Sequence, residues 1–523
     1  MARFDGRRLS WFRVGVLVIA ASALTFTALS GWRWFEDARA ADGRMSFAAY
    51  VDVAVTPQLA FEEPVSAAAR DVVLSFIVAS PAEPCTPSWG RDYSLDSASN
   101  ELDLDRRVAR LRQNKGDISV SFGGAANSEL ATVCSDEDAL LVAYRDVVNR
   151  YDVRMIDIDL EGAALTDPLA NARRARVLKE LQQERAKERK KLTVWLTLPV
   201  APTGLSTEAR SAVAATLKGG VKLSGVNMMT MDYGASRPAS QSMAAASIAA
   251  LNASHRQLGG IYSDAGDPIG PATIWKRMGA TPMVGQNDLA GEIFSLADAR
   301  ALNAFARDKG ITRLSMWSLN RDRSCGANYP DIRVVSNSCS GVDQGSLTFA
   351  AVLRSGFNDG NRLSAEHSVG APTPLTPMAL PSDDPATSPY AVWNSEQTYV
   401  EGTRIVRHRN VYMAKWWTQG DVPDDPTVDE FSTPWQLVGP VLPGEKPLVS
   451  TKLPAGAYPK WDAGKVYTKG ERVMFDEIAF AAKWWSQGDI PAERSSQSDP
   501  SPWIQLTEAQ LRKAAAGANN QSR

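Results

Sequence analysis

Residues 155–162 read MIDIDLEG, so acidic and aliphatic residues alternate along this stretch. Successive side chains of a β-strand point to opposite faces, which places Asp157, Asp159 and Glu161 together on one face of a predicted strand. In a barrel of parallel strands, that face would point inward and Glu161 would stand at the carboxyl-terminal mouth. The pattern therefore predicts a buried strand that carries a row of carboxyl groups.

The sequence on either side alternates short apolar runs with longer amphipathic runs. It predicts eight strands, at 47–52, 72–79, 118–122, 155–159, 192–198, 226–231, 282–286 and 312–317. Helices are predicted at 102–113, 136–151, 168–190, 207–217, 243–257, 296–308 and 347–354. This α/β order favours a (β/α)8 TIM barrel over residues 41–357. A doubly wound open sheet is the alternative, but no glycine-rich phosphate-binding loop follows the first strand.

The composition narrows the chemistry of the chain. It has 523 residues, with 57 Lys and Arg against 59 Asp and Glu, so no strong field recruits nucleic acid. Three histidines leave few routes to a Ser-His-Asp triad or a histidine-based zinc site. We expect neither a cofactor nor a metal. Divalent metal binding by Asp157 and Asp159 is the alternative, although no further ligand cluster is evident.

The three acids of the predicted strand lie about 6.6 Å apart from one to the next, because each is two residues further along. Like charges at this spacing inside a barrel raise the pKa of at least one carboxyl group. A carboxyl group with a raised pKa can donate a proton near neutral pH. The row therefore indicates general acid chemistry.

Residues 1–40 look like a targeting segment. Arginines precede an uncharged run at 14–32, which is long enough to cross a bilayer. Ala38-Arg39-Ala40 has the form of a cleavage site, so a retained anchor and a cleaved signal both stay open. Arg7-Arg8 is a weak match to a twin-arginine export signal. Either way we expect the remainder of the chain to be extracellular, secreted or tethered to the membrane.

Four cysteines would then lie in a compartment that permits disulfides. Three pairings are possible. We favour Cys325 with Cys339, which would close a short loop, and Cys85 with Cys134.

The last quarter of the chain holds a duplicated module. A proline-rich linker is predicted at 358–389, the modules at 390–438 and 458–507, a second linker at 439–457 and a tail at 508–523. Trp393 recurs 68 positions later as Trp461, and the string AKWWTQGDVP at 414–423 recurs as AKWWSQGDIP. Adjacent indoles in a strand should face opposite sides, one filling a small core and one left at the surface.

The carboxylate strand resembles a known family signature. Asp157-x-Asp159-x-Glu161 is similar to the end of the Asp-x-x-Asp-x-Asp-x-Glu motif of family 18 glycoside hydrolases, which are chitinases and related endo-N-acetylglucosaminidases. Residues 121–124, Ser-Phe-Gly-Gly, resemble that family's Ser-x-Gly-Gly. Residues 226–234, 281–288 and 316–318 resemble its later strands. Arg154 stands where the motif has its first Asp, and the tyrosine of the sixth-strand motif is displaced by one.

The resemblance implies a retaining, substrate-assisted hydrolysis of chitin, in which the acetamido group of the sugar attacks its own anomeric carbon. Glu161 would be the acid and base, Asp159 would orient the acetamide, and Asp157 would tune Asp159. The other implied contacts are Tyr233 or Asp232 to the acetamide, Trp317 under the ring, and Tyr50, Gln286, Asn287 and Ser121 at other strand ends. For Tyr50, Gln286 and Asn287 the alternative is that they satisfy loop backbone, and Ser121 is expected to shape the barrel.

The duplicated modules resemble chitin-binding modules of carbohydrate-binding families 5 and 12. The resemblance implies that Trp416, Trp417, Trp484 and Trp485 contact chitin, because an indole offers a flat face to a sugar ring. The alternative is that these rings are internal staples. The expected partners are chitin or N-acetylglucosamine oligosaccharides, and the membrane if residues 1–40 are retained; we expect a monomer. A non-catalytic chitin or peptidoglycan lectin and an endo-N-acetylglucosaminidase are the other functions considered.

Overall fold

The computed structural model describes residues 45–515 except 56–57, 65, 326–334, 358–380, 426, 429–431, 449–450, 452, 455, 494, 497–499, 508–509 and 513. The targeting segment predicted at 1–40 lies outside the described residues, as does most of the first predicted linker. Among the helices that are described, none is both long and apolar enough to cross a membrane. The predicted domain boundaries stay predictions.

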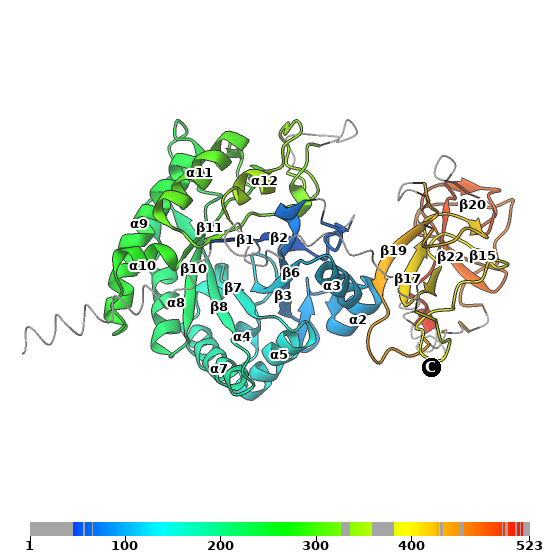
Figure 1. Ribbon diagram of the computed structural model, residues 1–523, viewed down its shortest axis with the longest axis horizontal. Helices are drawn as coiled ribbons and strands as arrows, with labels where there is room; N and C mark the ends of the chain where they lie inside the picture. The colour runs from blue at the N-terminus through cyan, green and yellow to red at the C-terminus, as the bar shows by residue number, and fades with distance from the viewer. Residues whose placement is uncertain are drawn as a thin grey trace, which may run out of the picture.

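Parallel strands form a closed ring (Figure 1). The ring contains β1 (Ser46–Phe47) with β2 (Ala49–Asp52), β3 (Asp71–Ala79), β6 (Asp117–Gly123), β7 (Met155–Asp159), β8 (Thr193–Ala201), β10 (Leu223–Met229), β11 (Met278–Thr281) and β14 (Arg313–Leu314). The first strand is split by Ala48; its β1 half pairs with β14 and its β2 half pairs with β3, both in parallel. This closure is that of the predicted (β/α)8 barrel.

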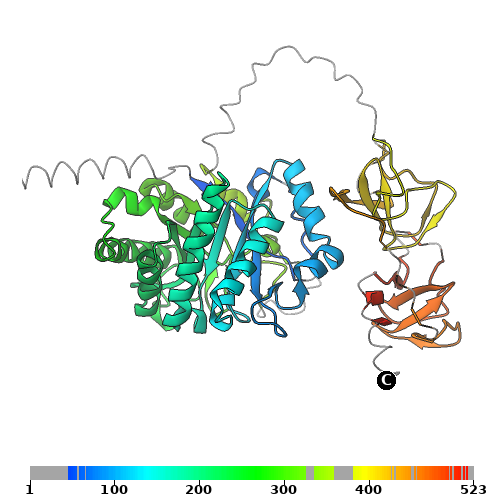
Figure 2. The same ribbon diagram turned by 90° about the horizontal axis from the view of Figure 1, so that it is seen from below.

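Helices cover the outside of the ring (Figures 1 and 2). They are α2 (Leu95–Glu101), α3 (Leu104–Gln113), α5 (Glu137–Arg150), α7 (Pro168–Lys187), α8 (Thr207–Lys218), α9 (Met243–Asp264), α11 (Leu296–Lys309) and α12 (Phe349–Arg354), with shorter α4 (Leu130–Val133), α6 (Gly162–Thr166) and α10 (Pro271–Lys276). Their starts follow capping rules: Asp167 caps α7 before Pro168, and Ser295 with Asp298 forms a capping box on α11.

The seventh strand differs from the prediction. Its residues are Met278–Thr281, whereas the sequence pattern placed it at 282–286. Residue 282 is a proline, which has no N–H to continue the ladder. Beyond it, β12 (Gly285–Gln286) pairs antiparallel with β13 (Ile293–Phe294) outside the ring. The prediction missed the strand because MGAT lacks the β-branched, alternating pattern that it relied on.

Two disulfides are formed, Cys85–Cys134 and Cys325–Cys339. The favoured pairing is therefore confirmed. The first joins the segment after β3 to the end of α4, and the second closes the loop after β14.

The two modules repeat one small antiparallel architecture. Module 1 (residues 390–438 with the end of its last strand) contains β15 (Thr398–Tyr399), β16 (Arg404–Arg407), β17 (Asn410–Ala414), β18 (Thr418–Gln419) and β19 (Trp435–Pro440). Module 2 (residues 458–507) contains β20 (Val466–Tyr467), β21 (Arg472–Phe475), β22 (Ile478–Ala482), β23 (Ser486–Gln487) and β24 (Trp503–Gln505). Each has a two-stranded and a three-stranded sheet, paired in the same order.

The adjacent indoles do not behave as the sequence predicted. Neither member of either pair belongs to a hydrophobic core, and in module 2 both are open, with exposed fractions of 43% for Trp484 and 60% for Trp485. The prediction of one buried and one exposed ring is wrong because β17 and β22 end before the pair. The cores are filled instead by Trp435 and Trp503, each edge-on to a tyrosine.

Candidate active site

A cavity of about 670 Å³ opens at the carboxyl-terminal end of the barrel strands. Eight of its lining residues lie in, or shortly after, seven strands of the ring, namely Tyr50, Phe76, Asp159, Glu161, Thr197, Met229, Thr281 and Trp317. This is the position where such barrels hold their active sites. The predicted acids Asp159 and Glu161 therefore lie in the cavity wall.

Asp157 lies below the cavity and is completely buried. Its Oδ2 accepts hydrogen bonds from the Tyr50 hydroxyl and the Ser121 hydroxyl, each at 2.8 Å. Its Oδ1 accepts from the Thr197 hydroxyl at 2.7 Å and from Arg313 Nη1 at 2.8 Å. These four donors come from four strands, β2, β6, β8 and β14. Because all its acceptor positions are used, Asp157 is fixed, which argues against the metal-binding alternative.

Asp159 is the next acid along β7, with 3% of its surface exposed. Its Oδ1 is buried and has no hydrogen-bond partner among the residues described. Burial, together with the charges of Glu161 and Asp157, raises the pKa of Asp159 well above its usual range, and Arg313 only partly offsets this. A buried oxygen without a hydrogen-bond partner is destabilising, so this oxygen is suited to accept a hydrogen bond from an N–H group of a ligand.

Glu161 follows β7 and precedes helix α6, with extended backbone at φ −132° and ψ 162°. Its side chain does not cap that helix. Burial, with smaller contributions from the carboxylates of Asp232 and Asp288, raises the pKa of Glu161 to about 7. A carboxyl group of this kind can both give and take a proton near neutral pH.

Asp232 and Tyr233, the two residues after β10 that were predicted to contact the acetamide, have side chains that point in different directions. Tyr233 lines the cavity, but its hydroxyl hydrogen-bonds the Ser247 hydroxyl of α9 at 3.1 Å. Asp232 has a left-handed backbone, φ 49°, and its Oδ1 accepts from the Leu289 N–H at 3.2 Å. Its carboxylate is close enough to raise the pKa of Glu161. Of the pair, Asp232 is therefore the side chain that faces the acid.

Aromatic rings form one side of the cavity. Trp317 stacks on Phe76 with ring centroids 5.4 Å apart and planes 20° apart, and Tyr50 lies 6.2 Å from Trp317. Gly124 makes room for Phe76, since a Cβ at position 124 would lie 3.0 Å from that ring. Gly123 likewise makes room for the Asp159 carbonyl, since a Cβ at position 123 would lie 2.0 Å from its oxygen. The Ser-x-Gly-Gly stretch thus allows β6 to end close against β7.

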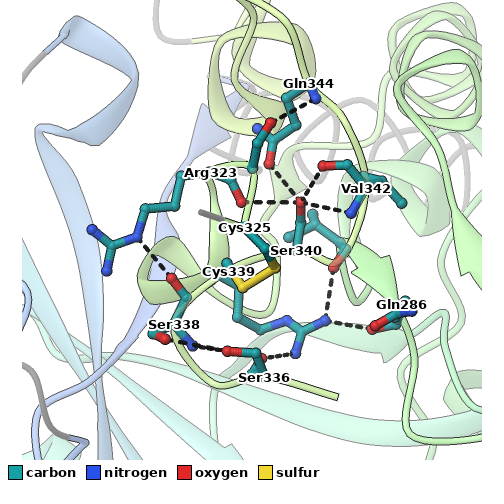
Figure 3. The surroundings of a disulfide bond; sticks show 12 residues. Gln286, Arg323, Cys325, Ser336, Ser338, Cys339, Ser340, Val342 and Gln344 are labelled. Carbon is teal, nitrogen blue, oxygen red and sulfur yellow. Dashed lines mark hydrogen bonds between the residues drawn. A yellow bond between two sulfur atoms is a disulfide. The ribbon is translucent and has the colours of Figure 1, made fainter. Parts of the chain in front are cut away.

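Three predicted sugar contacts do not line the cavity: Gln286, Asn287 and Ser121. Asn287 is 2% exposed and donates to the Met283 and Gly285 carbonyls, so it satisfies loop backbone. The Gln286 N–H donates to the Ser340 carbonyl at 2.8 Å, beside the Cys325–Cys339 disulfide (Figure 3). The Ser121 hydroxyl donates its hydrogen bond to Asp157. For Asn287 and Ser121 the supporting role considered above fits the geometry better than sugar contact, and sugar contact by Gln286 stays a prediction.

The sequence reasoning missed Arg313, Thr197, Asp288 and Phe76. Arg313 and Thr197 are in predicted strands, where a buried polar residue among apolar neighbours is a signal that a partner must exist. Phe76 has no such signal. Asp288 is exposed in a loop, and only the fold brings it towards Glu161.

The chain is similar to several known proteins. The chain is 35% identical over 261 residues to a probable bifunctional chitinase/lysozyme of Escherichia coli, covering 49% of this chain and 28% of that one. It is 36% identical over 222 residues to endochitinase 11 of Metarhizium anisopliae, covering 41% and 42%. Active domain 2 of the Pyrococcus furiosus chitinase superposes with a TM-score of 0.51 at 27% identity, covering 60% of this chain and 94% of that domain.

The barrel is therefore similar in sequence to two proteins named as chitinases and similar in fold to the Pyrococcus furiosus chitinase domain. Residues 460–503, which follow this chitinase-type barrel, match the model of carbohydrate-binding module family 5/12. The matched segment spans less than half of the length of either curated relative. The predicted resemblances of the barrel and of module 2 are thus confirmed.

The raised pKa of Glu161 predicts the pH dependence of the chitinase-type site. A general acid works while it is protonated, so kcat/KM is expected to fall as the pH rises through about 7. Asp288→Asn removes one of the carboxylates that raise this pKa, and should shift the alkaline limb to lower pH. The measurement is a pH profile on a soluble chitin oligosaccharide. Asp146→Asn, an exposed change on α5, should leave the limb in place.

Proposed function

We propose that this protein is a chitinase that hydrolyses β-1,4 bonds between N-acetylglucosamine units with retention at the anomeric carbon. The observation that carries the proposal is the pairing in one cavity wall of a carboxyl group with a pKa of about 7, Glu161, and an unsatisfied buried oxygen on Asp159. The first suits a proton donor and the second suits an acceptor for an amide N–H.

In the first step, Asp159 accepts a hydrogen bond from the acetamide N–H of the sugar bound at the scissile bond. The acetamide carbonyl oxygen then forms a bond to C1 while the bond from C1 to the leaving oxygen breaks. Glu161 gives its proton to that oxygen and becomes a carboxylate. Trp317, half-buried in the aromatic wall, supplies an apolar face for the ring.

In the second step, the Glu161 carboxylate takes a proton from a water molecule that attacks C1. The bond between C1 and the acetamide oxygen breaks, the acetamide is restored, and Glu161 is protonated again. Two inversions give net retention. Asp157, held by four donors that include Arg313, stays fixed beside Asp159 and does not itself touch the sugar.

The relatives named chitinase support this substrate class, and the Pyrococcus furiosus domain has been crystallised with chito-oligosaccharides. The family 5/12 match of module 2 supports attachment to the polymer. A lectin without activity is disfavoured because Glu161 is present and lines the cavity. We also propose export from the cytoplasm, secreted or tethered through residues 1–40, which the two disulfides support.

The test is hydrolysis of a chitin hexasaccharide followed by ¹H NMR at early times. We expect the new reducing ends to appear first as the β-anomer, because the mechanism retains configuration. Appearance of the α-anomer first would contradict the substrate-assisted mechanism. Absence of cleavage, with cleavage of peptidoglycan sacculi or of a glycoprotein glycan under the same conditions, would contradict the chitinase assignment.

A further inference from the structure

The two modules are similar in sequence but not in surroundings. Module 1 contacts the barrel through helix α3 (Figure 1). Arg106 of α3 binds Glu445, just beyond module 1, with Nη2 2.5 Å from Oε1, and donates to the Pro440 carbonyl at 2.6 Å. Arg404 of module 1 binds Asp103, which precedes α3, at 2.5 Å. These side chains are 6% (Arg106), 9% (Asp103), 13% (Arg404) and 22% (Glu445) exposed, so the ion pairs are largely shielded from water.

The backbone of module 1 also fits α3 closely. Gly439 of β19 has φ 152°, and a Cβ at this position would lie 2.8 Å from Arg106 Cγ and 2.9 Å from its carbonyl oxygen. A residue with a side chain would therefore push the strand away from the helix. The contact between module 1 and α3 therefore combines ion pairs with close packing of the Gly439 backbone against Arg106.

Module 1 also contacts module 2. Lys483 of module 2 binds Glu401 of module 1 at 2.7 Å, and the Thr403 hydroxyl donates to Gln505 Oε1 at 3.0 Å. The Trp417 N–H donates to the Ser495 hydroxyl at 3.1 Å. Figure 2 shows module 1 (yellow) beside the barrel and module 2 (orange) next to module 1. Module 1 thus joins the barrel to module 2.

The positions of module 2 that correspond to the barrel-contacting arginine and to the indole pair of module 1 are exposed to solvent. Arg472, 68 positions after Arg404, is exposed and donates to Tyr458 of its own module at 2.8 Å. Trp484 and Trp485 are exposed, whereas their counterparts Trp416 and Trp417 are half-buried. Lys483 lies 4.6 Å from the centre of the Trp484 ring while its ammonium binds Glu401, so module 1 helps to position the residue that supports this indole.

We propose that the two copies have separate tasks: module 1 is a connector that fixes module 2 to the barrel, and module 2 carries the main polymer-binding surface. The indole pair of module 2 is free to stack on sugar rings, and the pair of module 1 is partly covered. The polymer is chitin if the proposed function holds, on which this part of the inference rests. A fixed connection sets the distance from polymer to cavity, which a flexible linker would leave variable.

The connector is tested by small-angle X-ray scattering of the full chain without any ligand. Arg106→Ala with Arg404→Ala should release module 1 from α3 and increase the radius of gyration and the maximum dimension. Arg472→Ala, the matched change in module 2, should leave both unchanged. Glu445→Lys places like charge against Arg106 and repeats the test in a variant that leaves the barrel sequence intact. Unchanged scattering in both interface variants would overturn the connector role.

The binding surface is tested by adsorption to insoluble chitin. Trp484→Ala with Trp485→Ala should weaken binding by about tenfold or more, as expected when exposed aromatic contacts are lost. Trp416→Ala with Trp417→Ala should weaken it by less than about threefold, with the folded state of each variant verified by thermal unfolding. Equal losses would overturn the division of tasks alone. A wild-type chain that does not adsorb would overturn both this inference and the proposed attachment to chitin.

Discussion

Glu161→Gln is expected to lower kcat on chitin oligosaccharides by about 10²–10⁴-fold, the usual contribution of a general acid and base. The amide keeps the size of the side chain and its place before α6, but it can neither protonate the leaving oxygen nor activate water. The measurement is steady-state hydrolysis of a soluble chitin oligosaccharide, together with binding of the variant to insoluble chitin, which should survive.

The control for this variant is Glu180→Gln, the same chemical change on the exposed face of α7. It should hydrolyse the oligosaccharide at the rate of the unchanged chain. If Glu161→Gln retained more than a tenth of the activity, another residue would have to supply the proton, and the assignment of Glu161 would be wrong.

Arg313→Met should lower the free energy of unfolding of the barrel by about 3–5 kcal/mol, the range for removing one partner of a buried ion pair. Arg313 is 3% exposed and Asp157 is completely buried, so the remaining carboxylate would be left charged in a site that water does not reach. The measurement is urea unfolding. Adding Asp157→Asn to Arg313→Met should recover part of the loss, because no uncompensated charge remains.

Arg176→Met is the matched control, since Arg176 pairs with Glu137 at the surface of the barrel, with 56% and 42% of the two side chains exposed. Removing an exposed pair should cost less than about 1 kcal/mol. Similar losses for Arg176→Met and Arg313→Met would mean that the buried pair contributes no more than a surface pair.

Much of this barrel could be predicted from local pattern. Alternation along 155–161 identified the strand, and it also placed Asp157, Asp159 and Glu161 on one face, because in a strand both follow from the same period. The capping residues before α7 and α11 likewise lie next to the helices that they start. Such features depend on neighbours in sequence, so a single chain reveals them.

The features that could not be predicted depend on closure of the barrel and on the partners that side chains find in the folded structure. Arg313 reaches Asp157 across 156 residues, and only the ring of strands brings them together. Asn287 looks like a sugar ligand in the sequence, yet its amide is used by two nearby carbonyls. The near-identical strings that contain Trp417 and Trp485 gave no hint of unequal exposure, because that difference arises from what each module packs against.

The four hydrogen bonds to the Asp157 carboxylate have a consequence for how the protein folds. Its donors include Tyr50 near the start of the barrel and Arg313 near its end, so the full set of donors forms only after both ends of the barrel have met. A nascent chain that has already exposed MIDIDLEG would still lack that counter-ion until its eighth strand emerged. The complete set of donors around Asp157 would then assemble only when the barrel closes.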